Sequence, residues 1–189
     1  MTVVGYPGGS GPLTVEDLEW IPDDGRRHEL LDGMLLVSPV PGFRHQKVVC
    51  GLASVLARAC PADMHVLLGP FAVRPTGDTE LRPDLLVARD ADLTEELLPA
   101  APVLAVEVLS PNTVLIDQHT KKAAYQRMGT RSYWTVDPEA VRLTVFELGD
   151  DGTYAEVAAV EGEGAFGAEL PFSVRVVPAE LLGTLWGRG

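Results

Sequence analysis

The sequence predicts an α/β domain with a central mixed β-sheet flanked by helices, and three observations predict this class. Residues 43–60 place apolar side chains at helical spacing. Residues 103–109 form a run that is apolar on both faces, as in a strand covered on both sides. Strand and helix patterns alternate irregularly along the chain, which favours a mixed sheet over a regular array of βαβ units.

The chain length and composition indicate one domain. The 189 residues suit a single domain, since domains usually contain roughly 100–200 residues. We expect this domain over residues 13–185, after a flexible N-terminus over residues 1–12, which are rich in Gly and Pro. No apolar run reaches the roughly 20 residues of a membrane helix. Cys50 and Cys60 form no CxxC pair, so we expect a reduced, cytoplasmic protein.

The first half of the chain carries clear turn and cap signals. Thr14 is predicted to cap a short helix that Pro22 closes. The Asp32-Gly33 pair indicates a hairpin between two short extended segments. Residues 65–75 are typical of one strand with a kink at Gly69-Pro70.

The second half contains the strands on which the functional prediction depends. Asp84 follows Pro83, which suits the start of a strand, and opens a short apolar segment. A helix is predicted from about Val114 to Met128, ending at Gly129. We expect one βαβ unit from the Glu107 strand through this helix to SYWTVD. The segments VRLTVFEL, TYAEVAAV and PFSVRVV then predict strands, and PAELLGTLW predicts a closing helix.

The charge is strongly negative and unevenly distributed. The net charge of −12 argues against a protein that coats nucleic acid non-specifically, because phosphate binding depends on Lys and Arg. Residues 42–61 nevertheless contain bases and no acid, whereas residues 143–174 contain acids and no base. This uneven distribution of charge is compatible with a basic face at one part of the surface.

Glu107 is the residue that most directly predicts chemistry. A carboxylate inside an apolar, covered strand is costly unless it meets a cation, a metal or a hydrogen-bond donor. Asp84 opens a strand of similar character, and if the two strands pair, their carboxylates can point into one space. Two such carboxylates suit Mg²⁺ or Mn²⁺, which binds one or two carboxylates together with a substrate phosphate. We therefore predict Asp84 and Glu107 as metal ligands.

Further candidates surround this pair. Asp117, Lys121 and Tyr125 recur every four residues on the predicted helix, so they form one stripe, and Lys121 could orient a metal-bound water and stabilise the phosphate transition state. Glu29 could complete the metal shell from another direction. Possible phosphate contacts are Arg44, His45, Lys47 and Lys122.

Structural interpretations compete with each of these roles. Glu107 could simply form a buried ion pair with Lys121 or an arginine. Asp117 and Lys121 could be an ordinary surface pair, worth about 0.2–0.5 kcal/mol. Tyr125 is more typical of a packed side chain with a bonded hydroxyl than of a reactive one.

The segments RRHELLDGMLLVSP, FRHQKVV, RPDLLV, LAVEVLSPNT, DQHTKKAAY and GTRSYWTVD together resemble the Uma-type (Uma-two) restriction endonuclease family of the PD-(D/E)XK nuclease-like superfamily. The resemblance runs from about residue 13 to residue 180. It implies a restriction-endonuclease-like core and Mg²⁺-dependent phosphodiester hydrolysis with Asp84 and Glu107 in the superfamily motif. Leu109 stands where that motif has lysine, and the resemblance implies that Lys121 takes over this role. The superfamily's first glutamate most nearly matches Glu29.

Three function classes follow from these observations. The first is a divalent-metal-dependent endonuclease acting on DNA, which would suit a homodimer because one site cuts one strand. The second is a non-catalytic binding or regulatory module on the same fold, favoured by the acidic charge and by Leu109. The third, a glycosidase with two carboxylates, is disfavoured because aromatic residues make up only 6% of the chain.

Overall fold

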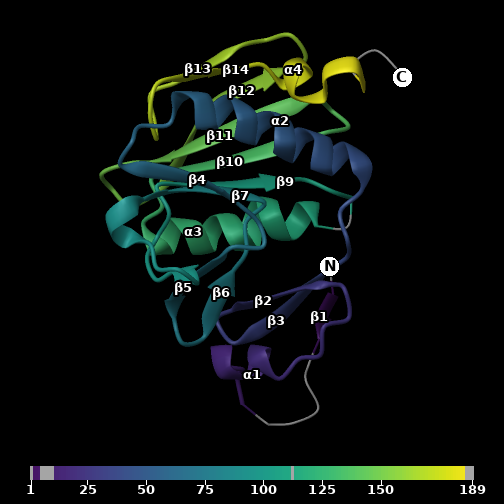
Figure 1. Ribbon diagram of the computed structural model, residues 1–189, viewed down its shortest axis with the longest axis vertical. Coiled ribbons are helices and arrows are strands. Elements are labelled where there is room, and N and C mark those ends of the chain that lie inside the picture. The colour runs from purple at the N-terminus through teal and green to yellow at the C-terminus, as the bar shows by residue number, and fades with distance from the viewer. Residues whose placement is uncertain (1, 5–10, 112, 186–189) are drawn as a thin grey trace.

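A six-stranded mixed sheet lies at the centre of the computed structural model, which describes residues 2–4, 11–111 and 113–185 (Figure 1). The strand order is β12-β11-β10-β9-β7-β4. The strands are β4 (Met64–Leu68), β7 (Leu85–Arg89), β9 (Leu104–Val108), β10 (Ser132–Asp137), β11 (Arg142–Leu148) and β12 (Tyr154–Glu161). The β9–β10 pair is parallel and the other pairs are antiparallel. The predicted α/β class with a central mixed sheet and the predicted βαβ unit are confirmed.

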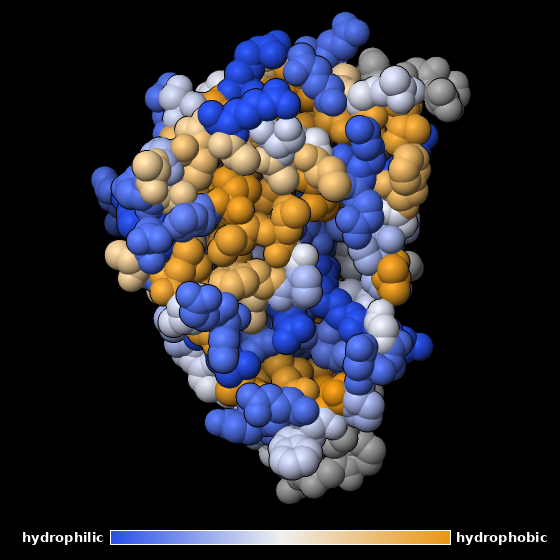
Figure 2. All heavy atoms as spheres, in the orientation of Figure 1, coloured by the Kyte–Doolittle hydropathy of each residue, from blue (hydrophilic) through white to orange (hydrophobic). Residues whose placement is uncertain are grey.

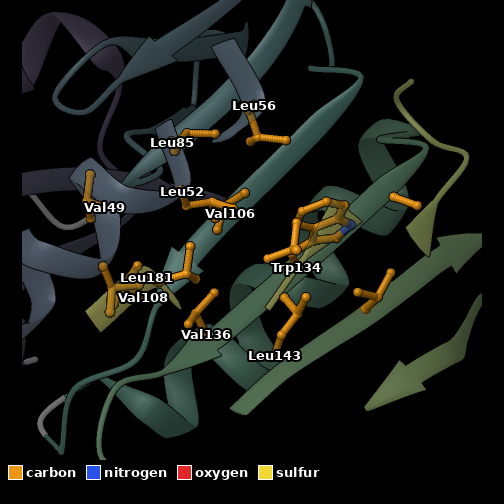
Figure 3. Packing of buried hydrophobic residues seen from close by; sticks show 14 of the residues in the cluster. Val49, Leu52, Leu56, Leu85, Val106, Val108, Trp134, Val136, Leu143 and Leu181 are labelled. Atoms are coloured by element: carbon orange, nitrogen blue, oxygen red, sulfur yellow. The ribbon is translucent and has the colours of Figure 1, made fainter. Parts of the chain in front are cut away.

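Helices cover both faces of this sheet, as the sequence predicts. Helices α2 (Phe43–Ala59) and α4 (Pro178–Leu182) lie on one face, and α3 (Lys122–Met128) lies on the other (Figure 1). The buried residues of α2 recur at helical spacing and pack on the sheet around Val106 and Trp134 (Figure 3). Helix α3 ends at Gly129, whose φ of 84° is the left-handed cap conformation that glycine favours.

A second six-stranded sheet lies beyond α3, in the order β1-β3-β2-β6-β5-β8. Its strands are β1 (Thr2–Val4), β2 (Arg27–Leu31), β3 (Met34–Ser38), β5 (Ala72–Thr76), β6 (Thr79–Leu81) and β8 (Leu97–Leu98). The β2–β3 hairpin turns at Asp32 and Gly33, both with positive φ, as predicted. Leu31 and Leu81 of this sheet pack with Tyr125 of α3 and Tyr133 of the central sheet, so α3 is held between the two sheets.

The smaller elements complete the chain. Helix α1 (Val15–Glu19) begins at Thr14, whose backbone N–H donates to the Asp17 carboxylate at 2.8 Å, as the cap signal predicts. Strands β13 (Phe166–Ala168) and β14 (Val174–Val176) form a two-stranded sheet. Single 3₁₀ turns lie at Asp90–Asp92 (η1) and Gly183–Leu185 (η3). In the described part of the chain, no helix has the length and apolar character needed to cross a membrane.

Two predictions about the fold differ from the structure. The single kinked strand over residues 65–75 is instead two strands, β4 and β5, which belong to different sheets because the chain turns at Gly69-Pro70. The N-terminus was expected to be loose over residues 1–12, but Thr2–Val4 pair with β3 through backbone hydrogen bonds that the Gly and Pro content does not reveal. Residues 1 and 5–10 of that segment lie outside the described residues.

Candidate active site

Asp84 and Glu107 come together because their strands are neighbours. Strands β7 and β9 are antiparallel, with Leu85 opposite Val106, so one step further along the register Asp84 stands opposite Glu107. The backbone N–H of Val108 donates to the Asp84 carboxylate at 2.8 Å. The turn before β7 is tight, since a Cβ on Gly69 would lie 2.7 Å from the carbonyl oxygen of Pro83. The strand pairing assumed for the two predicted metal ligands is therefore present.

Lys121 joins two buried glutamates. Its Nζ donates to Glu107 Oε1 at 3.0 Å and to Glu29 Oε1 at 2.9 Å, and all three side chains are buried. Glu29 also accepts the backbone N–H of Arg82 at 2.8 Å. The ion pair between Glu107 and Lys121 exists as the structural interpretation expects, and it brings Glu29 of the other sheet into the same cluster.

The helical segment that carries Lys121 is wider than an α-helix. Residues Ile116–Lys121 form a π-helical segment (η2) that leads into α3. In a π-helix each hydrogen bond spans five residues, and such turns occur often at functional sites. Asp117 lies within this segment, with Oδ1 3.8 Å from Lys121 Nζ, and both side chains are buried. The two residues therefore form part of the buried cluster and are not the surface pair of the structural interpretation.

Asp84 has two basic partners from elsewhere in the sequence. Arg27 Nη1 lies 2.7 Å from Asp84 Oδ1, and His45 Nε2 lies 3.0 Å from Asp84 Oδ2. His45 was predicted as a phosphate contact, and in this structure it pairs with the carboxylate. Arg27 was not predicted, although it lies two residues before Glu29 on β2, a spacing that puts both side chains on one face of the strand.

A cavity of about 820 Å³ opens onto this cluster. Its walls include the segment before β2, the β3–α2 connection and the N-terminal end of α2. Arg26, Arg27, Arg82, His45 and Asp84 line it, whereas the described lining includes neither Glu107 nor Lys121. Figure 2 shows hydrophilic residues crossing the waist of the molecule between two more apolar regions. Asp84 therefore reaches the cavity, with Glu107 and Lys121 behind it.

The cluster contains more carboxyl groups than permanent cations. Glu29, Asp84, Glu107 and Asp117 supply four buried carboxylates, while Arg27 and Lys121 supply two permanent positive charges. Within the described part of the chain, one oxygen each of three of these groups lacks a hydrogen-bond partner: Glu29 Oε2, Glu107 Oε2 and Asp117 Oδ1. Buried oxygens without partners destabilise a fold, so the cluster has room for additional positive charge.

The pKa shifts within the cluster diverge. Burial raises the pKa of Glu107 well above its ordinary value, despite the opposing charge of Lys121. Burial raises the pKa of Asp117 as well. For Asp84 burial also acts upward, but the His45 hydrogen bond and the Arg27 charge outweigh it and lower the pKa below its ordinary value. Asp84 is thus the ionised carboxylate at the cavity, a property suited to binding a cation.

The residues present fit a hard cation in chemistry, although they are not arranged as a complete set of ligands. Among the residues that the structure describes, no three His, Cys, Asp or Glu side chains converge as a ready metal site. The unpaired buried oxygen of Glu107 and the ionised Asp84 beside it are nevertheless oxygen donors of the kind that Mg²⁺ and Mn²⁺ prefer.

The other candidate residues lie apart from the cavity. Arg44 is 4.0 Å from Glu139, and Lys122 lies over the Phe146 ring at 4.2 Å. Lys47 points towards Gly183 near α4. Tyr125 is fully buried and stacks on Tyr133 at 5.4 Å between ring centroids. Tyr125 is therefore packed, as the structural interpretation predicts, but its hydroxyl has no hydrogen-bond partner in the described part of the chain.

Comparisons with known proteins agree with this fold. A family model named Uma2, described as "Putative restriction endonuclease", matches residues 15–178. Among solved structures, the chain is similar to the crystal structure of a "putative nuclease belonging to DUF820" from Anabaena variabilis. The TM-score is 0.73 at 18% sequence identity, over 92% of this chain and 99% of that chain, which shows a shared fold. A search of curated proteins found no significant match. Since the family model spans most of the chain, the protein belongs to the Uma2 restriction endonuclease family.

Proposed function

We propose that this protein is a divalent-metal-dependent endonuclease that hydrolyses phosphodiester bonds in DNA. The observation that carries the proposal is the excess of buried carboxyl groups over permanent cations beside an arginine-lined cavity. Four carboxylates face two permanent cations, and the carboxylate that reaches the cavity is ionised. A divalent cation would supply the positive charge that these carboxyl groups lack, and it would also attract a phosphate.

Each group has a role that its position supports. Asp84 and Glu107 would hold Mg²⁺ or Mn²⁺, which supplies a Lewis acid and an activated water when bound. Arg26 and Arg82 line the cavity, where guanidinium groups can bind phosphate oxygens in pairs. Lys121 lies behind Glu107 and holds its carboxylate in place through the 3.0 Å hydrogen bond. Lys121 therefore acts as a positioning residue in this arrangement.

Metal binding gives the most direct test of this proposal. At a free Mn²⁺ concentration of 100 times its dissociation constant, the free energy of unfolding should rise by about 2.7 kcal/mol. For a domain of this size the melting temperature should then rise by about 5–10 °C, as differential scanning calorimetry with and without Mn²⁺ would measure. The Asp84→Asn variant should show no such shift. Equal melting temperatures of the wild type with and without Mn²⁺ would contradict the proposal.

A non-catalytic binding module is the second candidate function, and one observation favours it. Glu107 is fully buried, and Lys121 already supplies it with a counter-charge without a metal. This function predicts affinity for nucleic acid or protein without Mn²⁺-dependent cleavage. An assay that follows nicking of plasmid DNA, with and without Mn²⁺, separates the two functions.

We also propose that the enzyme cuts duplex DNA as a two-fold homodimer, because each cavity holds one site and a single site cuts one strand. Sedimentation velocity at micromolar concentration should show a dimer of the 20.3 kDa chain. A monomer alone across that range would contradict this assembly. Cys50 and Cys60 are both free, which suits the reducing cytoplasm as its compartment.

A further inference from the structure

Arg27 occupies the boundary between the cavity and the buried cluster. Its side chain lines the cavity and is 22% exposed. Its Nη1 lies 2.7 Å from Asp84 Oδ1, and its Nε lies 3.5 Å from Glu29 Oε2. One guanidinium therefore contacts both the carboxylate at the cavity and a carboxylate of the cluster behind it.

Each oxygen of Asp84 already accepts a hydrogen bond. Oδ1 accepts from Arg27, while Oδ2 accepts from the Val108 backbone N–H and contacts His45 Nε2. A cation arriving at Asp84 from the cavity must therefore displace or share one of these partners. The Val108 donor belongs to strand β9 and cannot leave, whereas Arg27 has a long, partly exposed side chain. The His45 side chain is 11% exposed against 22% for Arg27, so Arg27 is the partner that a cation can displace most easily.

Displacement would leave Arg27 close to the substrate. A guanidinium recognises phosphate with the same paired donors that it offers to carboxylate. Arg26 and Arg82 line the same cavity, so a phosphate held there would lie among arginines that Arg27 could join. The carboxylate-bound and phosphate-bound positions of Arg27 would thus exclude each other.

We propose that Arg27 is an exchangeable counter-ion. It neutralises Asp84 and Glu29 in the free protein, and it transfers its guanidinium to a substrate phosphate when a divalent cation binds Asp84. This inference rests on the proposed nuclease function and adds a coupling between metal and substrate. Without substrate, the positive charge of Arg27 at Asp84 weakens binding of the cation. With substrate, Arg27 binds the phosphate instead, and the cation binds more tightly. Because binding linkage is reciprocal, the metal strengthens phosphate binding by the same factor.

The test compares Mn²⁺ affinity with DNA cleavage in the same variants. Arg27→Gln removes a competing positive charge, so Mn²⁺ titrated calorimetrically without DNA should bind about tenfold more tightly or better. The same variant should cleave plasmid DNA with a KM raised by about tenfold, because a phosphate contact is lost. Arg27→Lys keeps the charge but loses the paired geometry, so its Mn²⁺ affinity should stay within about twofold of the wild type while its KM rises.

Arg74→Gln is the matched control. Arg74 is 28% exposed, pairs with the buried carboxylate of Glu80 at 2.6 Å and lies outside the described lining of the cavity. It should change neither the Mn²⁺ affinity nor the KM. Weaker or unchanged Mn²⁺ binding by Arg27→Gln would overturn the exchange and leave the nuclease proposal standing. Failure of the wild type to bind Mn²⁺ at all would overturn both.

Discussion

Replacing Asp84 by Asn, or Glu107 by Gln, is expected to lower Mn²⁺-dependent cleavage of DNA by about a thousandfold or more. A bound cation stabilises the phosphate transition state by several kcal/mol, and each 1.36 kcal/mol changes the rate about tenfold. Both substitutions keep the size of the side chain and remove only the charge that would hold the cation. Single-turnover nicking of a supercoiled plasmid measures the rate directly.

Glu80→Gln provides the matched control for this loss. Glu80 is also a fully buried strand glutamate outside the described lining of the cavity, and it pairs with Arg74 and with Arg82, the second of which lines the cavity. Its substitution should leave the cleavage rate within about fivefold of the wild type, since it removes a partner of Arg74 and Arg82 and not a metal ligand. Cleavage at wild-type rates by either the Asp84 or the Glu107 variant would refute the assignment of these ligands.

The same Glu107→Gln variant should be more stable than the wild type without metal. Burial raises the pKa of Glu107 in the folded protein above its ordinary value of 4.5, so the folded protein holds a proton there more tightly than the unfolded chain does. The free energy of unfolding of the wild type therefore falls as the pH rises above this value. Glutamine removes that dependence, so the advantage of the variant over the wild type should be larger at pH 7 than at pH 5. Urea unfolding at several pH values would measure this difference.

Asp84→Asn should change stability in the opposite direction. Its pKa is lowered in the folded protein, so its contribution is present above the ordinary value of 3.8 and is lost as the pH falls through the folded value. The variant should therefore be less stable than the wild type at neutral pH. Opposite signs for two neighbouring carboxylates would distinguish their electrostatic surroundings from a general effect of mutation in the core.

Replacing Lys121 by Met is expected to destabilise the folded protein by about 3–5 kcal/mol, since removing one partner from a buried charged cluster leaves the others uncompensated. Lys121 is fully buried and contacts Glu29, Glu107 and Asp117. For a domain of this length, such a loss lowers the melting temperature by roughly 6–20 °C. Calorimetry of the metal-free variant would measure it.

The neighbouring lysine supplies the control for this prediction. Lys122 follows directly in the chain but lies over the Phe146 ring at 4.2 Å, partly exposed. Lys122→Met should therefore cost about 1 kcal/mol or less. The double variant Lys121→Met with Glu107→Gln should recover part of the loss, because the second change removes one uncompensated charge. Equal destabilisation by the two single lysine variants would contradict a buried role specific to Lys121.

Much of the fold and part of the site could be predicted from local patterns. Helical spacing located α2, the cap at Gly129 ended α3, and the apolar runs around Asp84 and Glu107 became the neighbouring strands β7 and β9. These features depend on periodicity and on turn residues, which can be recognised in a short window of sequence. The short strands β6, β8 and β13 could not be predicted, because pairing with distant segments creates them.

The sequence by itself determined the α/β class, the two acidic strands and the lysine that accompanies them, because burying a carboxylate in an apolar segment demands a counter-charge wherever the chain folds. Only the tertiary structure decided which basic groups pair with these carboxylates. Arg27 and His45 meet Asp84 from 57 and 39 residues away, and Lys121 meets Glu29 from 92 residues away. Such contacts depend on how two sheets and a helix pack against one another, and no local spacing encodes that packing.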